Sequence, residues 1–402
     1  MSRLPSSPAQ ACAVDDGRYH ASCLPSDHRY QNVALVLQGG GALGSYQAGV
    51  YEGLAQAGLH PNWVAGISIG ALNAAIIAGN PPQDRVGQLR RFWDGICRPP
   101  FLPRSPLSWP GSAEGWPDAV LDLHKRWEAW RALTEGQNGF FRPRLAFGGA
   151  EPGGPQHASF YDTAPLKSTL EALVDFDRLN DSRAMRVSVG AVNVRSGNFV
   201  YFDNTRERLR AEHFMASGAL PPGFPAVEID GEFYWDGGVV SNTPLQQVLT
   251  DGERKHSLVF QVDLWSAVGD LPEDLNRVAL RQKDIQYSSR TRMITTQLAN
   301  AQTYRRLLRE VLKQVPEAVR LNDPWCQRAA REACDRLFNV IHLIYRDKEG
   351  EGLHKDYQFG ALTMREHWQA GLNDIVDSLQ RPGWLDMPSP EQPFVTHDVH
   401  RS

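Results

Sequence analysis

The strongest constraint on the fold is a short motif of the form G-x-S-x-G, Gly66-Ile67-Ser68-Ile69-Gly70. Residues 63–67 form an apolar run that predicts a buried strand, and the Ala-rich residues 70–78 predict a helix that ends before Pro81. At such a turn the serine has a strained backbone, and its hydroxyl lies at the carboxyl edge of the sheet and at a helix N-terminus. Ser68 is therefore a candidate nucleophile. The alternative is a structural turn in which Ser68 only caps the helix.

Length and composition describe a protein with a large core. The chain has 402 residues, of which 42% are apolar and 22% charged, and its net charge of −4 gives no reason to expect nucleic acid. Residues 1–30 are rich in Ser, Pro and Asp and lack the apolar core of a secretory signal, and no apolar run is long enough to span a bilayer. Five scattered cysteines favour reduced thiols, and none has partners at metal-site spacing. We expect a cytoplasmic protein without a metal or other cofactor.

A second glycine-rich motif, Gly39-Gly40-Gly41-Ala42-Leu43-Gly44, lies between a predicted strand at residues 32–37 and a predicted helix at residues 45–57. Such loops offer backbone N–H groups to an anion. A dinucleotide is disfavoured because no acidic residue ends the next strand, and the absence of G-K-[ST] excludes a P-loop. With Ser68 after the adjacent parallel strand, we expect the N–H groups of Gly40 and Gly41 to form an oxyanion hole. A tight turn without a ligand is the alternative, although it does not require three consecutive glycines.

The general base that Ser68 needs is not an obvious histidine. His60 precedes the strand at the opposite edge of the sheet, His157 lies in a Gly/Pro-rich loop, and His213 lies on a predicted short helix. An acidic candidate is stronger, because residues 227–235 predict a hairpin with an Asp-Gly turn that leads into Asp236-Gly237-Gly238. Two glycines after the carboxylate let other groups approach it, so we favour Asp236 as the base over an ordinary turn aspartate. Since a free carboxylate is a weak base for a serine hydroxyl, we expect burial to raise its pKa.

In this order and context, the three motifs resemble those of the patatin-like phospholipases. The likeness includes Ala216-Ser217-Gly218-Ala219-Leu220-Pro221 and Ser241-Asn242-Thr243-Pro244, and extends over residues 33–264. Many relatives have D-G-A where this chain has D-G-G. The resemblance implies an α/β protein with a three-layer α/β/α fold, a mainly parallel central sheet and a metal-independent serine–aspartate dyad. It also implies the following site residues: Ser68 as nucleophile, Asp236 as base, Gly39, Gly40, Gly41, Ala42 and Gly44 for the oxyanion hole, Gly66 and Gly70 for the nucleophile elbow, and Gly237 and Gly238 for the base loop.

The sequence divides into a flexible tail at residues 1–30, a catalytic domain at 31–268 and a mostly helical C-terminal extension at 269–402 that packs on the core. In the extension, residues 304–319 carry an apolar stripe that we expect to pack on the protein's own core rather than on lipid. A strand at residues 339–345 and a helix at residues 364–379 complete it. The extension resembles one in a subgroup of bacterial patatin-like proteins, which assigns it no activity.

Two other functions stay open beside lipid hydrolysis through an acyl-enzyme. An acyltransferase of the malonyl-carrier type has a related turn, but it favours G-H-S-x-G-E where this chain has Ile67 and Ala71. A non-catalytic lipid-binding protein would not need all three motifs intact. We expect a phospholipase A, a lysophospholipase or an esterase. Its partner is a lipid acyl ester, with transient contact at a membrane surface as a peripheral protein.

The Pro-rich residues 98–117 predict a loop that meets lipid. Six prolines and two glycines exclude a regular element, yet the loop carries Phe101, Trp109 and Trp116. A satellite hydrophobic cluster under the loop is the alternative. We predict that Phe101→Ala combined with Trp109→Ala reduces turnover of long-chain vesicular lipid far more than turnover of a short soluble ester. Equal losses on both substrates would assign the loop to the fold.

Overall fold

The computed structural model describes residues 30–97, 118–144, 153–250, 254–346, 352 and 354–399. The expected tail, except Tyr30, and the expected lipid-facing loop at 98–117 lie outside the described residues. The strands are β1 (Asn32–Leu37), β2 (Trp63–Gly66), β3 (Arg142–Pro143), β4 (Tyr161–Asp162), β5 (Arg186–Asn193), β6 (Phe199–Asp203), β7 (Val227–Ile229), β8 (Glu232–Asp236), β9 (Ser257–Asp263), β10 (Phe338–Ile344) and β11 (Phe394–Asp398).

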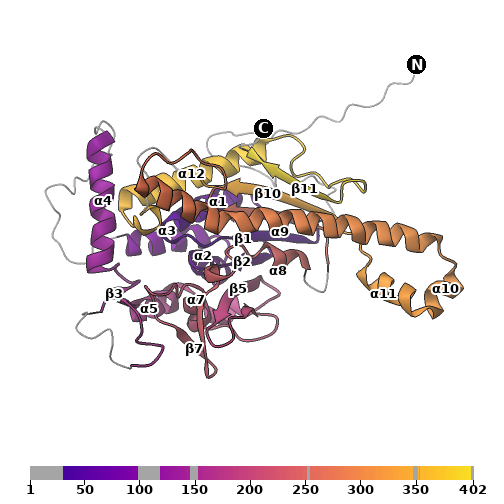
Figure 1. Cartoon of the computed structure of the whole chain (residues 1–402), viewed down its shortest axis with the longest axis horizontal. Helices are drawn as coiled ribbons and strands as arrows, with labels where there is room; N and C mark the ends of the chain where they lie inside the picture. Colours follow the sequence, from indigo (N-terminus) through magenta and orange to yellow (C-terminus); the bar gives the residue numbers. More distant parts are fainter. Residues whose placement is uncertain are drawn as a thin grey trace, which may run out of the picture.

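The helices of the described residues are arranged around these strands (Figure 1). They are the α-helices α1 (Gly44–Gln56), α2 (Ile69–Ala78), α3 (Arg85–Ile96), α4 (Asp118–Glu135), α5 (Ala164–Leu173), α6 (Phe176–Leu179), α7 (Ala211–Ser217), α8 (Leu245–Thr250), α9 (Leu275–Gln314), α10 (Glu317–Asn322), α11 (Pro324–Glu332) and α12 (Ala361–Gln380), and the 3₁₀ helices η1 (Gly41–Leu43), η2 (Gly237–Val239) and η3 (Lys355–Tyr357).

The central sheet is mainly parallel. Its strands follow the order β11-β10-β9-β1-β2-β5, and each neighbouring pair in this series is parallel. The antiparallel strands β6 and β8 pair with β5, and β7 pairs with β8. Because parallel strands end at one edge, the loops after β1 and β2 meet there. This edge carries both glycine-rich motifs.

Helices cover both faces of the sheet and make three layers. Alternate residues of a strand point to opposite faces. In β1, Leu35 and Leu37 join a large core with α1, α2, α3 and α12, whereas Ala34 and Val36 pack with α8 and with Leu298 of α9. The three-layer α/β/α fold with a mainly parallel sheet is therefore confirmed.

Several local predictions also hold, and one underestimated the extension. The hairpin with an Asp-Gly turn is β7–β8, where Asp230 and Gly231 both have positive φ. The strand expected at residues 339–345 is β10, and the terminal helix is α12. However, β10 pairs with β9, and β11 pairs with β10. The C-terminal extension thus adds two parallel strands to the main sheet as well as helices. The boundary at residues 268 and 269 stays a prediction.

The apolar stripe of residues 304–319 does not pack on the core as expected. Leu307 is 57% exposed and Val311 is 60% exposed. The cause is the length of α9, whose 40 residues span about 60 Å at about 1.5 Å per residue. Its last turns extend beyond the sheet, where α11 lies beside α9 and α10 packs on α11 (Figure 1).

The extension and the first helix touch at backbone distance. A Cβ on Gly371 of α12 would lie 2.0 Å from the Tyr46 carbonyl oxygen of α1, and one on Gly49 would lie 1.9 Å from the Trp368 carbonyl oxygen.

We predict that Gly371→Ala lowers the free energy of unfolding by about 1–3 kcal/mol, because the helices must separate. Gly87→Ala in α3 is the matched control, since nothing lies within 4 Å of its Cβ position. It should stabilise by about 0.5–1 kcal/mol in urea unfolding. Equal effects of the two substitutions would contradict the close crossing.

Candidate active site

Strand β5 brings Ser68 and Asp236 together. β2 runs parallel to β5 with Gly66 opposite Val189, and β8 runs antiparallel with Asp236 opposite Ala191. Because β6 pairs with the same part of β5 from its other edge, β2 and β8 must share one edge and meet end to end. Ser68 follows β2 by two residues, so it lies beside the last residue of β8.

The turn at Ser68 is strained and densely packed. Ser68 has φ 56°, a region that a residue with a side chain rarely adopts. A Cβ on Gly66 would lie 2.4 Å from the Gly70 carbonyl oxygen, and one on Gly70 would lie 2.4 Å from the Leu37 carbonyl oxygen. Only glycine fits at either position. The Ser68 side chain makes no capping bond to α2, so helix capping does not account for this serine.

The carboxylate of Asp236 is buried against the Ser68 hydroxyl. Asp236 is 2% exposed, and it accepts hydrogen bonds from the Ser68 side chain and from the Gly238 N–H at 2.7 Å. Burial raises the pKa of the Asp236 carboxyl to about 7, although these two hydrogen bonds act to lower it. The expected rise in pKa is thus present. A base whose pKa lies near neutral pH is well matched to abstracting a proton there.

One loop, at residues 216–221, holds the backbones of both Ser68 and Asp236. The Ser68 N–H donates to the Ser217 carbonyl oxygen at 3.1 Å, and the Asp236 N–H donates to the Ala219 carbonyl oxygen at 3.0 Å. Ser217 Oγ donates to the Gly190 carbonyl oxygen at 2.7 Å, which ties this loop to β5. The loop contains the Ala216–Pro221 motif, but its role could not be predicted from sequence because it consists of backbone contacts.

The glycine-rich loop after β1 is held in place through the carbonyl group of Gly39. The Gly39 carbonyl oxygen accepts hydrogen bonds from Asn242 Nδ2 at 2.9 Å and from Trp265 Nε1 at 2.8 Å. Because a trans peptide is planar, the N–H of Gly40 points away from these two donors. A Cβ on Gly39 would lie 2.9 Å from Ser68 Cβ, so the loop runs directly beside Ser68.

The amides of Gly40 and Gly41 are the candidate oxyanion donors. Among the described residues, neither amide donates a hydrogen bond, and both glycines are half-buried. Gly41 has φ 57°, which favours glycine. In contrast, the N–H of Gly44 donates to the Gly41 carbonyl oxygen, and a Cβ on Gly44 would lie 2.5 Å from Ile69. Gly44 and the buried Ala42 therefore serve the packing of η1 and α1.

The glycines after Asp236 also have distinct tasks. A Cβ on Gly237 would lie 2.7 Å from the Gly190 carbonyl oxygen, so its lack of a side chain lets β8 approach β5. Gly238 supplies the amide that binds the carboxylate. The loop at Gly237 and Gly238 thus both buries Asp236 and orients it.

Gln38 and Asn242 hold the glycine loop in place and were not among the predicted site residues. Gln38 Oε1 accepts from the N–H groups of Leu264 and Trp265, and its Nε2 donates to Thr243 Oγ1 at 3.1 Å. Asn242 binds Gly39 as described above. Both are buried amides that connect the glycine loop to the segments after η2 and β9. Gln38 precedes the glycine motif and Asn242 lies within the Ser241–Pro244 motif, and these positions were their only signal in the sequence.

The three histidines considered as bases lie elsewhere. His60 lies between α1 and β2, at the edge where β2 begins. His157 is exposed and its Nδ1 lies 2.6 Å from the Gly153 carbonyl oxygen. His213 is buried in α7, where its Nδ1 accepts from the Arg210 N–H at 2.9 Å. None of these contacts involves Ser68 or Asp236.

The part of the chain that the structure describes contains no group of three or more His, Cys, Asp or Glu side chains placed to hold a metal ion. Over the same residues, no helix is long and apolar enough to cross a membrane.

Comparison with known families identifies the class of protein. The model of the patatin-like phospholipase family matches residues 35–249, more than half of the chain. The chain belongs to the patatin-like phospholipases. A second family model, described as patatin phospholipase, matches residues 285–391 in the C-terminal part. In general terms, the family makes the protein a lipid acyl hydrolase.

Two solved structures are similar to the chain. One is VipD from Legionella pneumophila, with 14% sequence identity and a TM-score of 0.39, over 92% of this chain and 71% of that chain. The other is human GIVD cytosolic phospholipase A2, with 14% identity and a TM-score of 0.29, over 57% of this chain and 42% of that chain. No curated protein matches the chain significantly.

The raised pKa predicts a stability change. Since the folded-state pKa of Asp236 lies above its ordinary value of 3.8, ionisation destabilises the fold as the pH rises from about 4 to about 7. The neutral isostere in Asp236→Asn removes this cost. We predict that it raises the melting temperature at pH 8 and changes it much less at pH 4. Glu273→Gln, at an exposed carboxylate, is the control. A gain that does not depend on pH would contradict a buried, titrating Asp236.

Proposed function

We propose that the protein is a metal-independent serine lipid acyl hydrolase of the phospholipase A, lysophospholipase or esterase type. Its nucleophile is Ser68 and its base is Asp236. The observation that carries the proposal is the hydrogen bond between the Ser68 hydroxyl and the buried Asp236 carboxylate, beside a loop with two unengaged amides. A neutral-range pKa lets this carboxylate act as a base without a histidine.

In the acylation step, Asp236 accepts the hydroxyl proton as Ser68 Oγ attacks the ester carbonyl carbon. The carbonyl oxygen becomes an oxyanion, which accepts hydrogen bonds from the N–H groups of Gly40 and Gly41. When the tetrahedral intermediate collapses, the bond to the alcohol breaks and the alcohol takes the proton from Asp236. The product is an acyl-Ser68 ester.

The second step repeats this chemistry with water. Asp236 accepts a proton from the water as its oxygen attacks the acyl carbon, and the same amides bind the oxyanion. Collapse breaks the bond to Ser68 Oγ, which takes the proton back. A fatty acid leaves and the free enzyme is restored.

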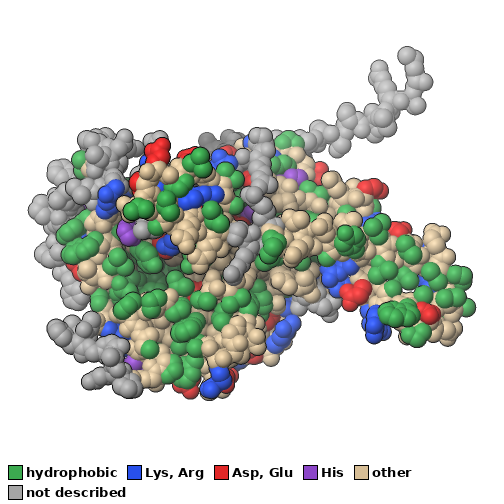
Figure 2. All heavy atoms as spheres, viewed as in Figure 1, with side chains coloured by type: hydrophobic (Ala, Val, Ile, Leu, Met, Phe, Trp, Pro, Cys, Tyr) green, Lys and Arg blue, Asp and Glu red, His purple; other side chains and the backbone are tan. Residues whose placement is uncertain are grey.

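An exposed aromatic pair supports transient contact with a lipid surface. Trp127 and Trp130 of α4 stack with ring centroids 5.1 Å apart and are 51% and 53% exposed. Val120 and Leu133 of the same helix are also exposed. Tryptophan is favoured where a lipid meets water. Figure 2 shows hydrophobic side chains gathered around a hollow beside α4.

The dyad is tested by covalent labelling and by matched substitutions. We predict that a fluorophosphonate modifies Ser68, located by peptide mapping, and that Ser68→Ala abolishes both labelling and ester hydrolysis. Asp236→Asn should lower kcat by about 10²–10⁴-fold, because it cannot accept the proton. The controls His60→Ala, His157→Ala and His213→Ala should keep most activity per folded molecule. Labelling at another residue, or full activity of Ser68→Ala, would refute the mechanism.

A further inference from the structure

The C-terminal part of the chain packs directly on the candidate oxyanion loop. A Cβ on Gly41 would lie 2.3 Å from the carbonyl oxygen of Asp356 in η3. On the other side, a Cβ on Gly40 would lie 2.8 Å from the Leu264 side chain and 3.2 Å from Trp265 Nε1. Both glycines thus have one face pressed against neighbouring residues. A shift of either neighbour would move the two amides.

Trp265 is the contact through which α9 reaches this loop. Its indole N–H donates to the Gly39 carbonyl oxygen at 2.8 Å, which fixes the Gly39–Gly40 peptide. Its ring lies 4.9 Å from the ring of Tyr287 in α9, with an angle of 32° between the planes. Trp265 is 3% exposed. Together with Asn242, which donates to the same oxygen, this side chain therefore sets the direction of the Gly40 N–H.

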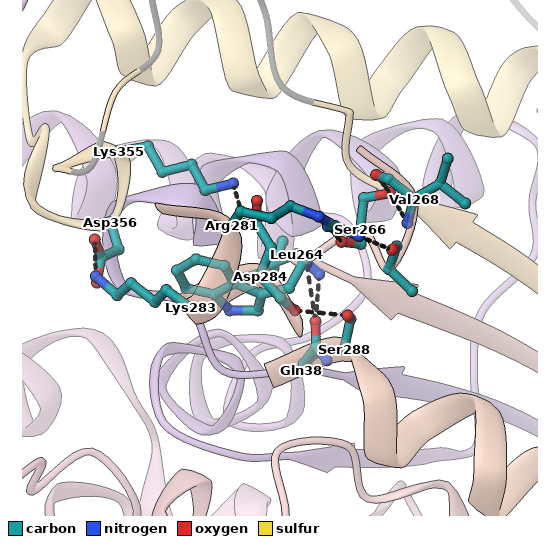
Figure 3. A network of polar contacts seen from close by, with 12 residues as sticks. Gln38, Leu264, Ser266, Val268, Arg281, Lys283, Asp284, Ser288, Lys355 and Asp356 are labelled. Atoms are coloured by element: carbon teal, nitrogen blue, oxygen red, sulfur yellow. Dashed lines mark hydrogen bonds and ion pairs between the residues drawn. The ribbon is translucent and has the colours of Figure 1, made fainter. Parts of the chain in front are cut away.

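Two ion pairs join α9 to η3 in a crossed arrangement. Lys283 Nζ lies 2.6 Å from Asp356 Oδ2, and Lys355 Nζ lies 2.7 Å from Asp284 Oδ1. Adjacent residues of α9 thus bind adjacent residues of η3 with opposite polarity. Figure 3 shows both pairs, with Gln38 and Leu264 close by. We refer to Lys283–Asp356 and Asp284–Lys355 as the crossed ion pairs.

Both lysines of the crossed ion pairs also lie over Trp265. Lys283 Nζ is 5.5 Å from the centroid of the Trp265 ring, and Lys355 Nζ is 4.9 Å from it. An ammonium over an indole face is attracted by the ring, more so when both are removed from water. The ion pairs therefore hold the ring as well as the two backbone segments.

Stability alone is a weak reason for these pairs. Lys355 is 0% exposed and Asp284 and Asp356 are each 7% exposed, so desolvation offsets much of the attraction. Apolar residues of similar size often hold such a contact equally well. What the charges add is a fixed register between η3 and α9, because exchanging the partners would place lysine against lysine and aspartate against aspartate.

We propose that the crossed ion pairs are a positioning device for the oxyanion loop. Through Trp265 and the Asp356 carbonyl, they hold the amides of Gly40 and Gly41 in the direction that a developing oxyanion needs. This inference rests on the function proposed above. It gives the C-terminal part a task in catalysis, since without α9 and η3 the loop would lose two of its supports.

The test compares kcat with KM on a short soluble ester. In Lys283→Met and in the double variant Asp284→Leu with Lys355→Met, kcat should fall about 10- to 100-fold, because small displacements of donors cost rate. KM should stay within about twofold, since the donors act on the transition state. Lys283→Arg, which keeps the charge, should retain most of kcat. Fluorophosphonate labelling of Ser68 should slow in the same proportion as kcat.

A chemically matched pair elsewhere supplies the control. Arg186 Cζ lies 3.9 Å from the centroid of the Trp63 ring, and Arg186 Nη2 lies 2.8 Å from Oδ2 of the buried Asp203. Trp63 and Arg186 are the first residues of β2 and β5, so this pair lies at the edge of the sheet opposite to Ser68. Arg186→Met should lower the melting temperature without changing kcat per folded molecule.

The outcomes separate the two proposals. Suppose that the wild type is labelled at Ser68. If the folded Lys283→Met variant and the folded double variant then keep wild-type kcat and labelling rate, the positioning role alone is overturned. A change confined to KM, or a loss equal to the unfolded fraction, would overturn it too. Wild-type protein that neither labels nor turns over would overturn both the inference and the proposed function.

Discussion

The buried hydrogen bond between the Ser68 hydroxyl and the Asp236 carboxylate constrains how the rest of the site is built. No cation pairs with this carboxylate among the described residues, and its hydrogen-bond partners are Ser68 and Gly238. Burying an unpaired charge is costly, so the pKa rises. The residues around Asp236 must be rigid to keep its carboxyl group buried and its pKa raised. The pairing of β2 and β8 with one edge of β5, and the loop that holds both backbones, provide that rigidity.

Close backbone contact recurs at every level of the structure. Gly66 and Gly70 let α2 approach the strands at Ser68, and Gly237 lets β8 approach β5 at Asp236. Gly49 and Gly371 let the C-terminal helix α12 cross α1. Each position would place a Cβ well inside the contact distance of a carbonyl oxygen. A fold of this kind tolerates little movement, which suits a mechanism that depends on the direction of two amides.

The sequence predicts the parts of the site whose signals are local. The turn at Ser68, the Asp-Gly hairpin before Asp236 and the parallel order of the first strands follow from short runs of residues. Contacts distant in sequence leave no such signal. Trp265 follows an apolar strand like any core residue, yet its indole binds Gly39, more than 200 residues earlier. The placement of β10 and β11 in the main sheet also depends on tertiary pairing. The exposure of the last turns of α9 depends on the length of this helix, which hydrophobic periodicity does not predict.

In the proposed mechanism, Asp236 with its raised pKa is the base and no histidine takes part. The most direct measurement is the pH dependence of the rate at which a fluorophosphonate modifies Ser68. We predict a rate that rises through a single ionisation at a pKa of about 7 and levels off above it, with the same profile in His60→Ala, His157→Ala and His213→Ala. A rate that is already maximal at pH 5, or a rise that disappears when one of these histidines is replaced, would contradict it.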